Sequence, residues 1–374
     1  RGETTGKVLL QTGPGRDAIA KSVMIQESRR RTNTPSICCH HTAWRLVRQL
    51  RSDFPPELTL PSRHCAPSML SWVRVTTIDP MHTSTAPIRL ARRFHVGWTF
   101  LLFLSIVVGA LLAIPTYAYY YDYSALDWTL FVILYFISGL GITVGYHRLM
   151  SHRSFECPNW VKGALLIGGA WALQNSAIKW TADHLRHHAQ CDKEADPYNA
   201  QLGFWHSHCG WLFSERKHDD IQYASRVAQD PVAIWQHRHY AAIVLGGLAL
   251  TFVIGWLANG WVGGVGCFLL AGVGRTFAVL NSTFCINSIC HLWGSQPHGT
   301  KDSSRDSWFV SLITFGEGYH NYHHTYPSDY RNGPRWYDFD PSKWLIYTLS
   351  LLGLATNLRT ASFAGESSRS TPGA

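Results

Sequence analysis

Four long apolar segments divide this chain, and they come in two pairs. The first pair covers residues 97–121 and 126–146, and the second covers residues 240–259 and 261–284, with an uncharged turn around Gly260 between them. Each segment has about 20 residues, the length that a helix needs to cross the hydrocarbon core of a bilayer. Two further apolar stretches, residues 160–178 and 343–358, are interrupted or short and predict interfacial or buried helices. The pattern therefore predicts an all-α integral membrane protein with four transmembrane helices.

The first 80 residues follow a different pattern. They are rich in Arg, Ser, Thr and Pro, they lack a sustained apolar period, and the chain begins at Arg1 rather than at a methionine. The segment MHTSTAPIRLARRF, which starts at Met81, reads like the natural beginning of a protein. We expect residues 1–80 to be a disordered tail or an over-extended reading frame, and residues 81–374 to form the membrane domain.

Charge supports a membrane location and indicates an orientation. Charged residues make up 15% of the chain, against about 25% in typical soluble domains. The net charge is +9, but no basic patch with interleaved aromatic residues occurs, which argues against nucleic-acid binding. Arg89, Arg92 and Arg93 precede the first apolar segment, and residues 147–239 carry many Lys, Arg and His, whereas the loop 121–127 carries only acids. The positive-inside rule then places both termini and the central region in the cytoplasm.

Histidines are concentrated in four short motifs that alternate with the apolar segments: HRLMSH, DHLRHH, NSICH and HNYHH. Successive residues of an α-helix are rotated by about 100°, so positions i, i+3 and i+4 share a face. His184, His187 and His188 are therefore expected to converge on one point, and the three histidines of HNYHH on another. His147 and His152 are five residues apart, about 140° around a helix. The helix must end or bend between these two residues if both face one centre.

The spacing favours metal ligation over a structural role. A single histidine on such a face is usually a hydrogen-bonded core residue, but three clusters at ligand spacing are a different case, and eight or nine imidazoles are too many for one ion. The motifs predict two ions, with redox iron as the natural candidate. The carboxylates Asp183, Glu317 and Asp329 would orient the rings, unless they are ordinary caps and surface acids. A structural role is kept for the histidines without this spacing: His82, His95, His206, His208, His218, His237, His239 and His298.

The motifs HRLMSH, DHLRHH and GYHNYHHTYPSDYRNG, with NSICHLWG and DKEADPYN, resemble the histidine boxes of the membrane acyl-CoA desaturases, the stearoyl-CoA desaturase-like family. The resemblance covers residues 92–358. It implies four transmembrane helices that carry a cytosolic helical cap with a histidine-rich di-iron site, and no catalytic residue beyond that site. Asn287 matches the position that holds an iron through a water molecule. The implied direct ligands are His147, His152, His184, His187, His188, His291, His320, His323 and His324.

The resemblance also implies a reaction and its reactants. Members of the family introduce a cis double bond, usually between carbons 9 and 10 of a saturated long-chain acyl-CoA, with O2 and two electrons. Gln174, Trp180 and Thr283 match positions at the bend of a substrate tunnel, and Tyr135 matches its end, although Trp180 would equally suit helix packing. An H-P-G-G haem motif does not follow the third box. The implied electron donor is therefore a separate protein, such as cytochrome b5 or a ferredoxin with its reductase, and the setting is a bacterial inner membrane or the endoplasmic reticulum.

Two other classes of function remain open from the sequence. A related membrane di-iron enzyme could hydroxylate lipids or alkanes, or could desaturate acyl chains that are bound to phospholipid. A metal transporter without catalysis would need polar residues inside the apolar segments. Those segments contain few such residues apart from Arg275, Asn281 and some hydroxyl groups, which makes the transporter the weaker alternative.

Overall fold

The computed structural model describes residues 5–8, 23–27, 73–75, 98–214 and 220–361. The chain divides into two compact units, residues 1–89 and 90–374. In the first unit, β1 (Thr5–Val8), β2 (Val23–Glu27) and β3 (Val73–Val75) form an antiparallel sheet in the order β1-β2-β3. The other residues of the expected N-terminal extension, and the segment with Arg89, Arg92 and Arg93, lie outside the described residues.

The regular elements described in the second unit are helices, as the sequence predicts for this part of the chain. The first apolar pair is an antiparallel hairpin. Its first arm runs through α2 (Trp98–Val108), η1 (Gly109–Ala113) and α3 (Ile114–Tyr120), and its second arm through α4 (Ala125–Leu140) and η2 (Gly141–Ser151). Ser124 begins α4 as an N-cap, because its hydroxyl accepts from the Asp127 backbone N–H while the Asp127 carboxylate accepts from the Ser124 N–H. This capping box makes the turn between the two arms.

The second apolar pair is one helical run that folds back on itself. It comprises α9 (Tyr240–Cys267), η7 (Phe268–Gly274) and α10 (Arg275–Leu292). Asn259 and Gly260 are not helical, and Gly260 has φ +66°, a left-handed conformation that suits glycine. The rings of Phe252 and Trp261 then lie 5.0 Å apart, on opposite sides of this reversal.

Among the described residues, three helical segments are long and apolar enough to cross a membrane: Thr99–Tyr120, Ala125–Ser151 and Tyr240–Leu292. The third has 53 residues, or about 80 Å of helix, against a hydrocarbon core of about 30 Å. Its reversal at Gly260 divides it into two arms, so the structure contains four apolar arms, which we call the stem. Leu112, Leu245 and Leu257 on the stem are 62%, 64% and 77% exposed, as expected of a surface that contacts lipid.

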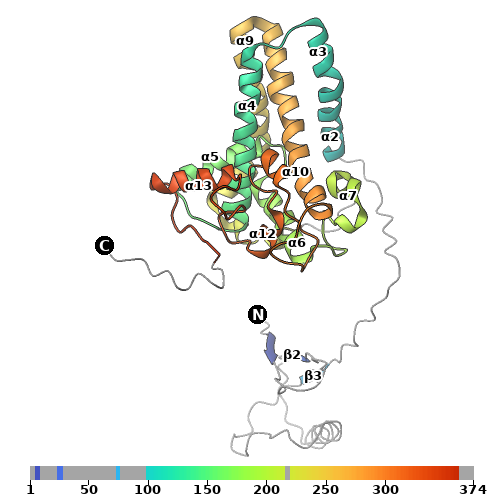
Figure 1. Ribbon diagram of the computed structural model, residues 1–374, viewed down its shortest axis with the longest axis vertical. Helices are drawn as coiled ribbons and strands as arrows, with labels where there is room; N and C mark the ends of the chain where they lie inside the picture. Colours follow the sequence, from blue (N-terminus) through green and yellow to red (C-terminus); the bar gives the residue numbers. More distant parts are fainter. Residues whose placement is uncertain (1–4, 9–22, 28–72, 76–97, 215–219, 362–374) are drawn as a thin grey trace, which may run out of the picture. The chain divides into compact units, whose positions relative to one another are not determined.

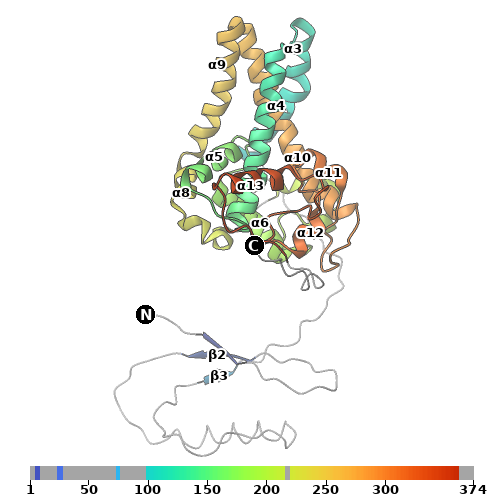
Figure 2. The same cartoon turned by 60° about the vertical axis from the view of Figure 1, so that its left-hand side comes forward.

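The shorter helices form a compact base at one end of the stem, and both stem turns lie at the opposite end (Figures 1 and 2). The apolar stretch 160–178 is not one helix, because α5 ends at Ala170 and α6 begins at Ala177. Likewise, the helix expected over residues 343–358 ends at Leu351. The elements of the base are α5 (Asn159–Ala170), α6 (Ala177–Gln190), η3 (Ala200–Leu202), α7 (Phe204–His208), η4 (Gly210–Phe213), η5 (Asp220–Ala224), η6 (Val227–Gln229), α8 (Pro231–Arg238), α11 (Trp308–Ile313), α12 (His320–Thr325) and α13 (Pro341–Leu351).

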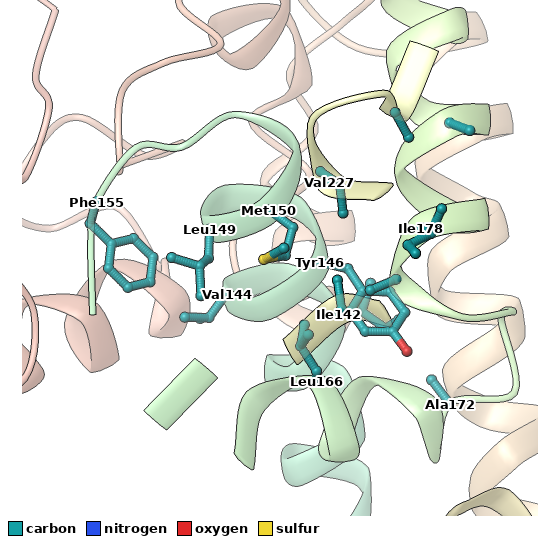
Figure 3. Packing of buried hydrophobic residues seen from close by; sticks show 14 of the residues in the cluster. Ile142, Val144, Tyr146, Leu149, Met150, Phe155, Leu166, Ala172, Ile178 and Val227 are labelled. Carbon is teal, nitrogen blue, oxygen red and sulfur yellow. The ribbon is translucent and has the colours of Figure 1, made fainter. Parts of the chain in front are cut away.

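The main hydrophobic core lies where η2 enters the base (Figure 3). Tyr146 is fully buried there among Leu166 of α5, Ile178 of α6 and Val227 of η6. The Tyr146 hydroxyl accepts a hydrogen bond from the Gln236 amide at 2.8 Å. This packing anchors η2, the element that carries the first histidine motif.

Candidate metal centre

Histidines from all four motifs gather in two buried groups. The first cluster consists of His147, His152, His184, His188 and His323, and the second consists of His187, His291, His320 and His324. Within each cluster the candidate ligand atoms lie within 4.8 Å of one another. Together the clusters contain the nine histidines singled out in the sequence.

Each H-x-x-H-H motif is divided between the clusters, which contradicts the expectation that its three histidines converge on one point. In α6, His184 and His188 lie in the first cluster and His187 in the second. In α12 the roles are exchanged, because His320 and His324 lie in the second cluster and His323 in the first. Positions i and i+4 are about 40° apart on a helix, whereas i+3 and i+4 are about 100° apart. The i, i+4 pair therefore faces one centre and the intervening histidine faces the other.

His147 and His152 reach the same cluster because η2 is a π-helix. The His152 backbone N–H donates to the His147 carbonyl oxygen at 3.1 Å, the i→i+5 bond of this wider helix. One π-turn therefore separates the two residues, and their rings lie 4.8 Å apart. The helix ends at Ser151, between the two residues as expected, and the turn before this end is widened.

In four rings Nδ1, which we call the outer nitrogen, contacts an acceptor from another segment. His147 Nδ1 lies 2.7 Å from a Glu317 carboxylate oxygen. Glu317 is predicted from the sequence, whereas three groups in equivalent positions are not, and of these only the aspartate within DKEADPYN belongs to a sequence motif. These are Asp196 at 2.9 Å from His187 Nδ1, Asp302 at 3.1 Å from His324 Nδ1 and Ser303 at 2.8 Å from His291 Nδ1.

The Nε2 atoms, which we call the inner nitrogens, face one another at short range within each cluster. A ring that donates through Nδ1 presents a lone pair at Nε2, which is the atom that a cation between the rings would bind. The Nε2 atom of His187 is buried and has no hydrogen-bond partner among the described residues. In each cluster the Nε2–Nε2 distances are short: His147–His323 3.0 Å, His152–His184 2.7 Å, His184–His188 3.1 Å, His188–His323 2.9 Å, His291–His320 3.1 Å and His320–His324 3.1 Å.

A buried network of ion pairs contacts the first cluster through Glu317. The guanidinium of Arg148, 1% exposed, donates to the carboxylates of both Glu317 and Asp340, at 2.9 Å to each from its nearest nitrogen. Although burial tends to raise it, the pKa of Glu317 is lowered overall because His147 and Arg148 lie against the carboxylate. Glu317 therefore stays anionic at neutral pH and holds the His147 ring in place.

Five of the rings are neutral at pH 7 and so are available as ligands. Burial is the main cause, because it disfavours the charged imidazolium, and the neighbouring histidines add to the effect. A neutral imidazole is the form that binds metal, so the donor set fits metal ions. The pKa is lowered well below the ordinary value of 6.5 for five rings: His152, His184, His188, His320 and His323.

Two cavities meet beside the clusters. The inner cavity, about 50 Å³, is lined by Tyr135 together with His147, His184, His187 and His320. The outer cavity, about 230 Å³, is lined by residues of α2, α6 and α10, including Asp183. Asp183 thus borders a cavity, and the described contacts place Asp329 against Tyr322 and Arg331. The two cavities share four residues: Trp180, His184, Thr283 and Asn287.

The residues expected at a tunnel bend are joined by hydrogen bonds at this junction. The Gln174 amide donates to the Thr283 hydroxyl at 2.8 Å, and the Trp180 indole N–H donates to the Gln174 carbonyl oxygen at 3.1 Å. Elsewhere in the lining of the inner cavity, the Tyr135 hydroxyl donates to the Ile313 carbonyl at 2.7 Å. Of the histidines given a structural role, His208 and His237 lie outside both clusters and bond to Ser288 and Ser176.

Comparison with known proteins adds a family and several relatives. A model of the fatty acid desaturase family matches residues 124–344. The chain is 43% identical to a probable acyl-CoA desaturase of Schizosaccharomyces pombe, over 61% of this chain and 48% of the relative. It is 37% identical to acyl-CoA desaturase 1 of Saccharomyces cerevisiae, over 71% and 52%, so the chain spans about half the length of these two relatives. It is 35% identical to an sn-1 stearoyl-lipid 9-desaturase of Anabaena variabilis, over 75% and 97%.

Proposed function

This chain belongs to the fatty acid desaturase family, which confirms the resemblance inferred from its histidine motifs, and from that premise we propose that it desaturates long-chain acyl groups with O2. The proposed reaction introduces a cis double bond, at carbons 9 and 10, into a saturated acyl-CoA. The observation that carries this proposal is the pair of histidine clusters at the wall of a cavity that continues into a second, larger one.

The donor sets support a pair of iron ions. The five imidazoles of the first cluster would hold one ion, and the four of the second cluster would hold the other. Asn287, which lines the inner cavity with His187 and His320, would add a ligand through water. Iron bound there would supply the oxygen-activating redox chemistry that removal of hydrogen from an unactivated methylene requires.

The remaining task of the protein is to position the acyl chain. The outer cavity would admit the chain, the junction at Trp180 and Thr283 would bend it, and the inner cavity would hold its methyl end against Tyr135, which suits chains of about 16 to 18 carbons. The Gln174 bridge between Trp180 and Thr283 stiffens the junction. A fixed bend determines which pair of methylenes lies beside the clusters, and so which bond reacts.

The setting that we propose is a multi-pass membrane protein with four spans. The four arms of the stem would cross the bilayer, and the base with its histidine clusters would lie in the cytoplasm with both termini. Residues 81–374 would form the catalytic domain and residues 1–80 an appendage. Electrons would come from a separate carrier, such as cytochrome b5 or a ferredoxin with its reductase.

Desaturation of acyl chains on phospholipids is the second candidate. Two relatives that the chain covers almost completely are named as lipid 9-desaturases: the Anabaena protein and an sn-2 palmitoyl-lipid 9-desaturase of a Nostoc strain, which is 38% identical over 90% of its length. The outer cavity also borders the stem, since Leu102, Phe103 and Ile106 of α2 line it. A chain attached to a bilayer lipid would meet this wall directly.

Expression in a host without its own desaturase, with an electron donor supplied, tests the proposal. We expect new monounsaturated fatty acids with the double bond at carbon 9, and none from His184→Ala. Brief isotope labelling separates the two carriers, because the product appears first either in the acyl-CoA pool or in phospholipid. Unchanged lipids with the protein present in the membrane would refute desaturation, and alcohol products would indicate a hydroxylase.

A further inference from the structure

The loop of residues 171–176, which joins α5 to α6 and which we call the bend loop, has an unfavourable backbone. Leu173 and Asn175 have φ values of +57° and +73°. This left-handed region is costly for a side chain such as leucine. Strain of this kind persists only where surrounding contacts hold it, and it is often found at functional sites.

The bend loop is held from several sides. The Asn175 N–H donates to the Tyr240 hydroxyl at 3.1 Å, and the Tyr146 hydroxyl donates to the Asn175 carbonyl at 3.3 Å. At the start of the loop, the Trp171 indole N–H donates to the Ile243 carbonyl at 3.1 Å. The Trp171 carbonyl, at the C-terminus of α5, accepts a hydrogen bond from the guanidinium of Arg275.

Arg275 is an unusual residue to find at this place. It lies on α10 within an apolar segment long enough to span a membrane, and it is 2% exposed. Its Nε donates to the Ala271 carbonyl at 3.2 Å, and no carboxylate among the described residues forms an ion pair with it. Burial of a cation in such surroundings is unfavourable, so charged residues there generally have a function. Arg275 is not a predicted metal ligand, and its hydrogen-bond partners Ala271 and Trp171 are not predicted ligands either.

Arg275 is connected to the junction of the two cavities through the bend loop and through α10. Gln174 lies between the two left-handed residues of the bend loop, and its amide reaches Thr283 on α10. Arg275 lies on the same helix, eight residues before Thr283. One helix therefore grips the bend loop twice, at the Trp171 carbonyl and at the Gln174 side chain.

We propose that Arg275 is a positioning residue that sets where the acyl chain bends, and thereby the position of the new double bond. The inference rests on the proposed function. Arg275 acts through the bend loop: it holds the Trp171 carbonyl, the loop places Gln174, and Gln174 holds Thr283 and Trp180 at the junction.

The test compares Arg275→Met, Arg275→Lys and the matched control Thr276→Val in the desaturase-deficient host. Thr276 is the next residue on α10, is 1% exposed, and bonds only to Gly272 of its own helix in the described contacts. For Arg275→Met we expect a mixture of neighbouring double-bond positions and a turnover that is about tenfold to a hundredfold lower, the order of loss that a small misplacement causes. Arg275→Lys restores part of both properties, and the control matches the parent. Iron content and membrane abundance are measured for each variant.

Two further variants make the result decisive. Gln174→Leu shifts the positions in the same way, and Arg275→Met adds no further shift to it if the arginine acts through Gln174. Tyr240→Phe removes the hydrogen bond between the Tyr240 hydroxyl and the bend loop, and gives a smaller shift in double-bond position. If Arg275→Met does not accumulate in the membrane, Tyr240→Phe takes its place as the test. An unshifted product pattern in Arg275→Met, or in Tyr240→Phe when it stands in, overturns this inference. A parent chain that forms no double bond overturns the proposed function instead.

Discussion

The histidines of the two clusters differ in the groups that contact their Nδ1 atoms. His147, His187 and His324 each have a carboxylate at the outer nitrogen, which leaves the inner nitrogen to face the cluster. Second partners of this kind fix ring orientation and increase ligand basicity. The charge of the carboxylates also offsets part of the charge that two metal ions would bring into a buried site.

The division of each motif predicts separate losses of metal. If the proposed ligand sets are correct, His184→Ala removes a donor from the first cluster, and His187→Ala, three residues away, removes a donor from the second. Because metal affinity depends on the complete ligand set, we expect each purified variant to keep about half of the parent's iron. Metal analysis measures this, with His239→Ala, an exposed residue at the end of α8, as the control that keeps all of it. Loss of all iron from both variants would contradict two separately held ions.

A second prediction concerns Asp329, which accepts hydrogen bonds from Tyr322, Arg331 and the backbone N–H of Ala361. Burial tends to raise the pKa of Asp329, but the bonds from Arg331 and Ala361 outweigh it and lower the pKa below the ordinary 3.8. A carboxyl group with a lowered folded-state pKa stabilises above its unfolded pKa, and the stabilisation is lost as the pH falls through the folded value. Asp329→Asn should therefore cost about 1–3 kcal/mol at pH 7.

Thermal unfolding in detergent, measured as a function of pH, tests this prediction. The difference between Asp329→Asn and the parent should shrink steadily below pH 3.8. Asp122→Asn, in the exposed turn between α3 and α4, should match the parent at every pH. A difference that stays constant into acid would mean that the charge of Asp329 contributes nothing.

At the scale of elements, η2 is positioned by close contact with α5. A Cβ atom built on Gly141 would lie 2.1 Å from the Gly169 nitrogen and 2.4 Å from the Gly168 carbonyl carbon. The two backbones thus touch at the point where the π-helix begins. Because η2 then carries His147 and leads to His152, the crossing of these helices determines where two histidines of the first cluster lie.

Gly141→Ala should therefore disturb both stability and the metal site. The added methyl group meets backbone atoms that cannot rotate away, and overpacking of this kind costs about 1–3 kcal/mol or more. We expect a lower unfolding temperature and less iron per chain. The control is Gly246→Ala on α9, where a Cβ meets nothing within 4 Å. Equal stability and iron content in the two variants would show that the contact has no importance.

For the whole molecule, the important feature is the reversal of the long apolar run at Gly260. With this reversal the second apolar pair is a hairpin like the first, and the two turns lie at the same end of the stem (Figure 1). All four histidine motifs lie at the opposite end of the arms. A membrane that enclosed the stem would thus leave the clusters on one side and both turns on the other.

Labelling of single cysteines tests this topology in a variant whose native cysteines are replaced by serine. Cysteines placed at Asp122 and Asn259, in the two turns, should react with an impermeant reagent added outside intact cells. A cysteine at Gln229, in the base, should react only after permeabilisation. Asn259 that is shielded from both sides would indicate that residues 240–292 do not form two spans.

The sequence by itself determined the local properties of this protein. Apolar runs of sufficient length predict the stem, because a chain in lipid must satisfy its backbone groups within a helix, and the uncharged turn at Gly260 marks the second hairpin. The types and spacing of the histidines predict a buried metal centre and carry the resemblance to the family, because helix geometry determines the angles between neighbouring rings.

Only the tertiary structure decided which histidines share a centre. The angle between His187 and His188 follows from the helix, but the cluster that each one joins depends on where η2, α10 and α12 pass. The same holds for Ser303, which bonds to Asp192, and for the loop gripped by Arg275, because each of these contacts joins segments more than 100 residues apart. Local spacing limits directions, whereas only packing supplies the partners that meet there.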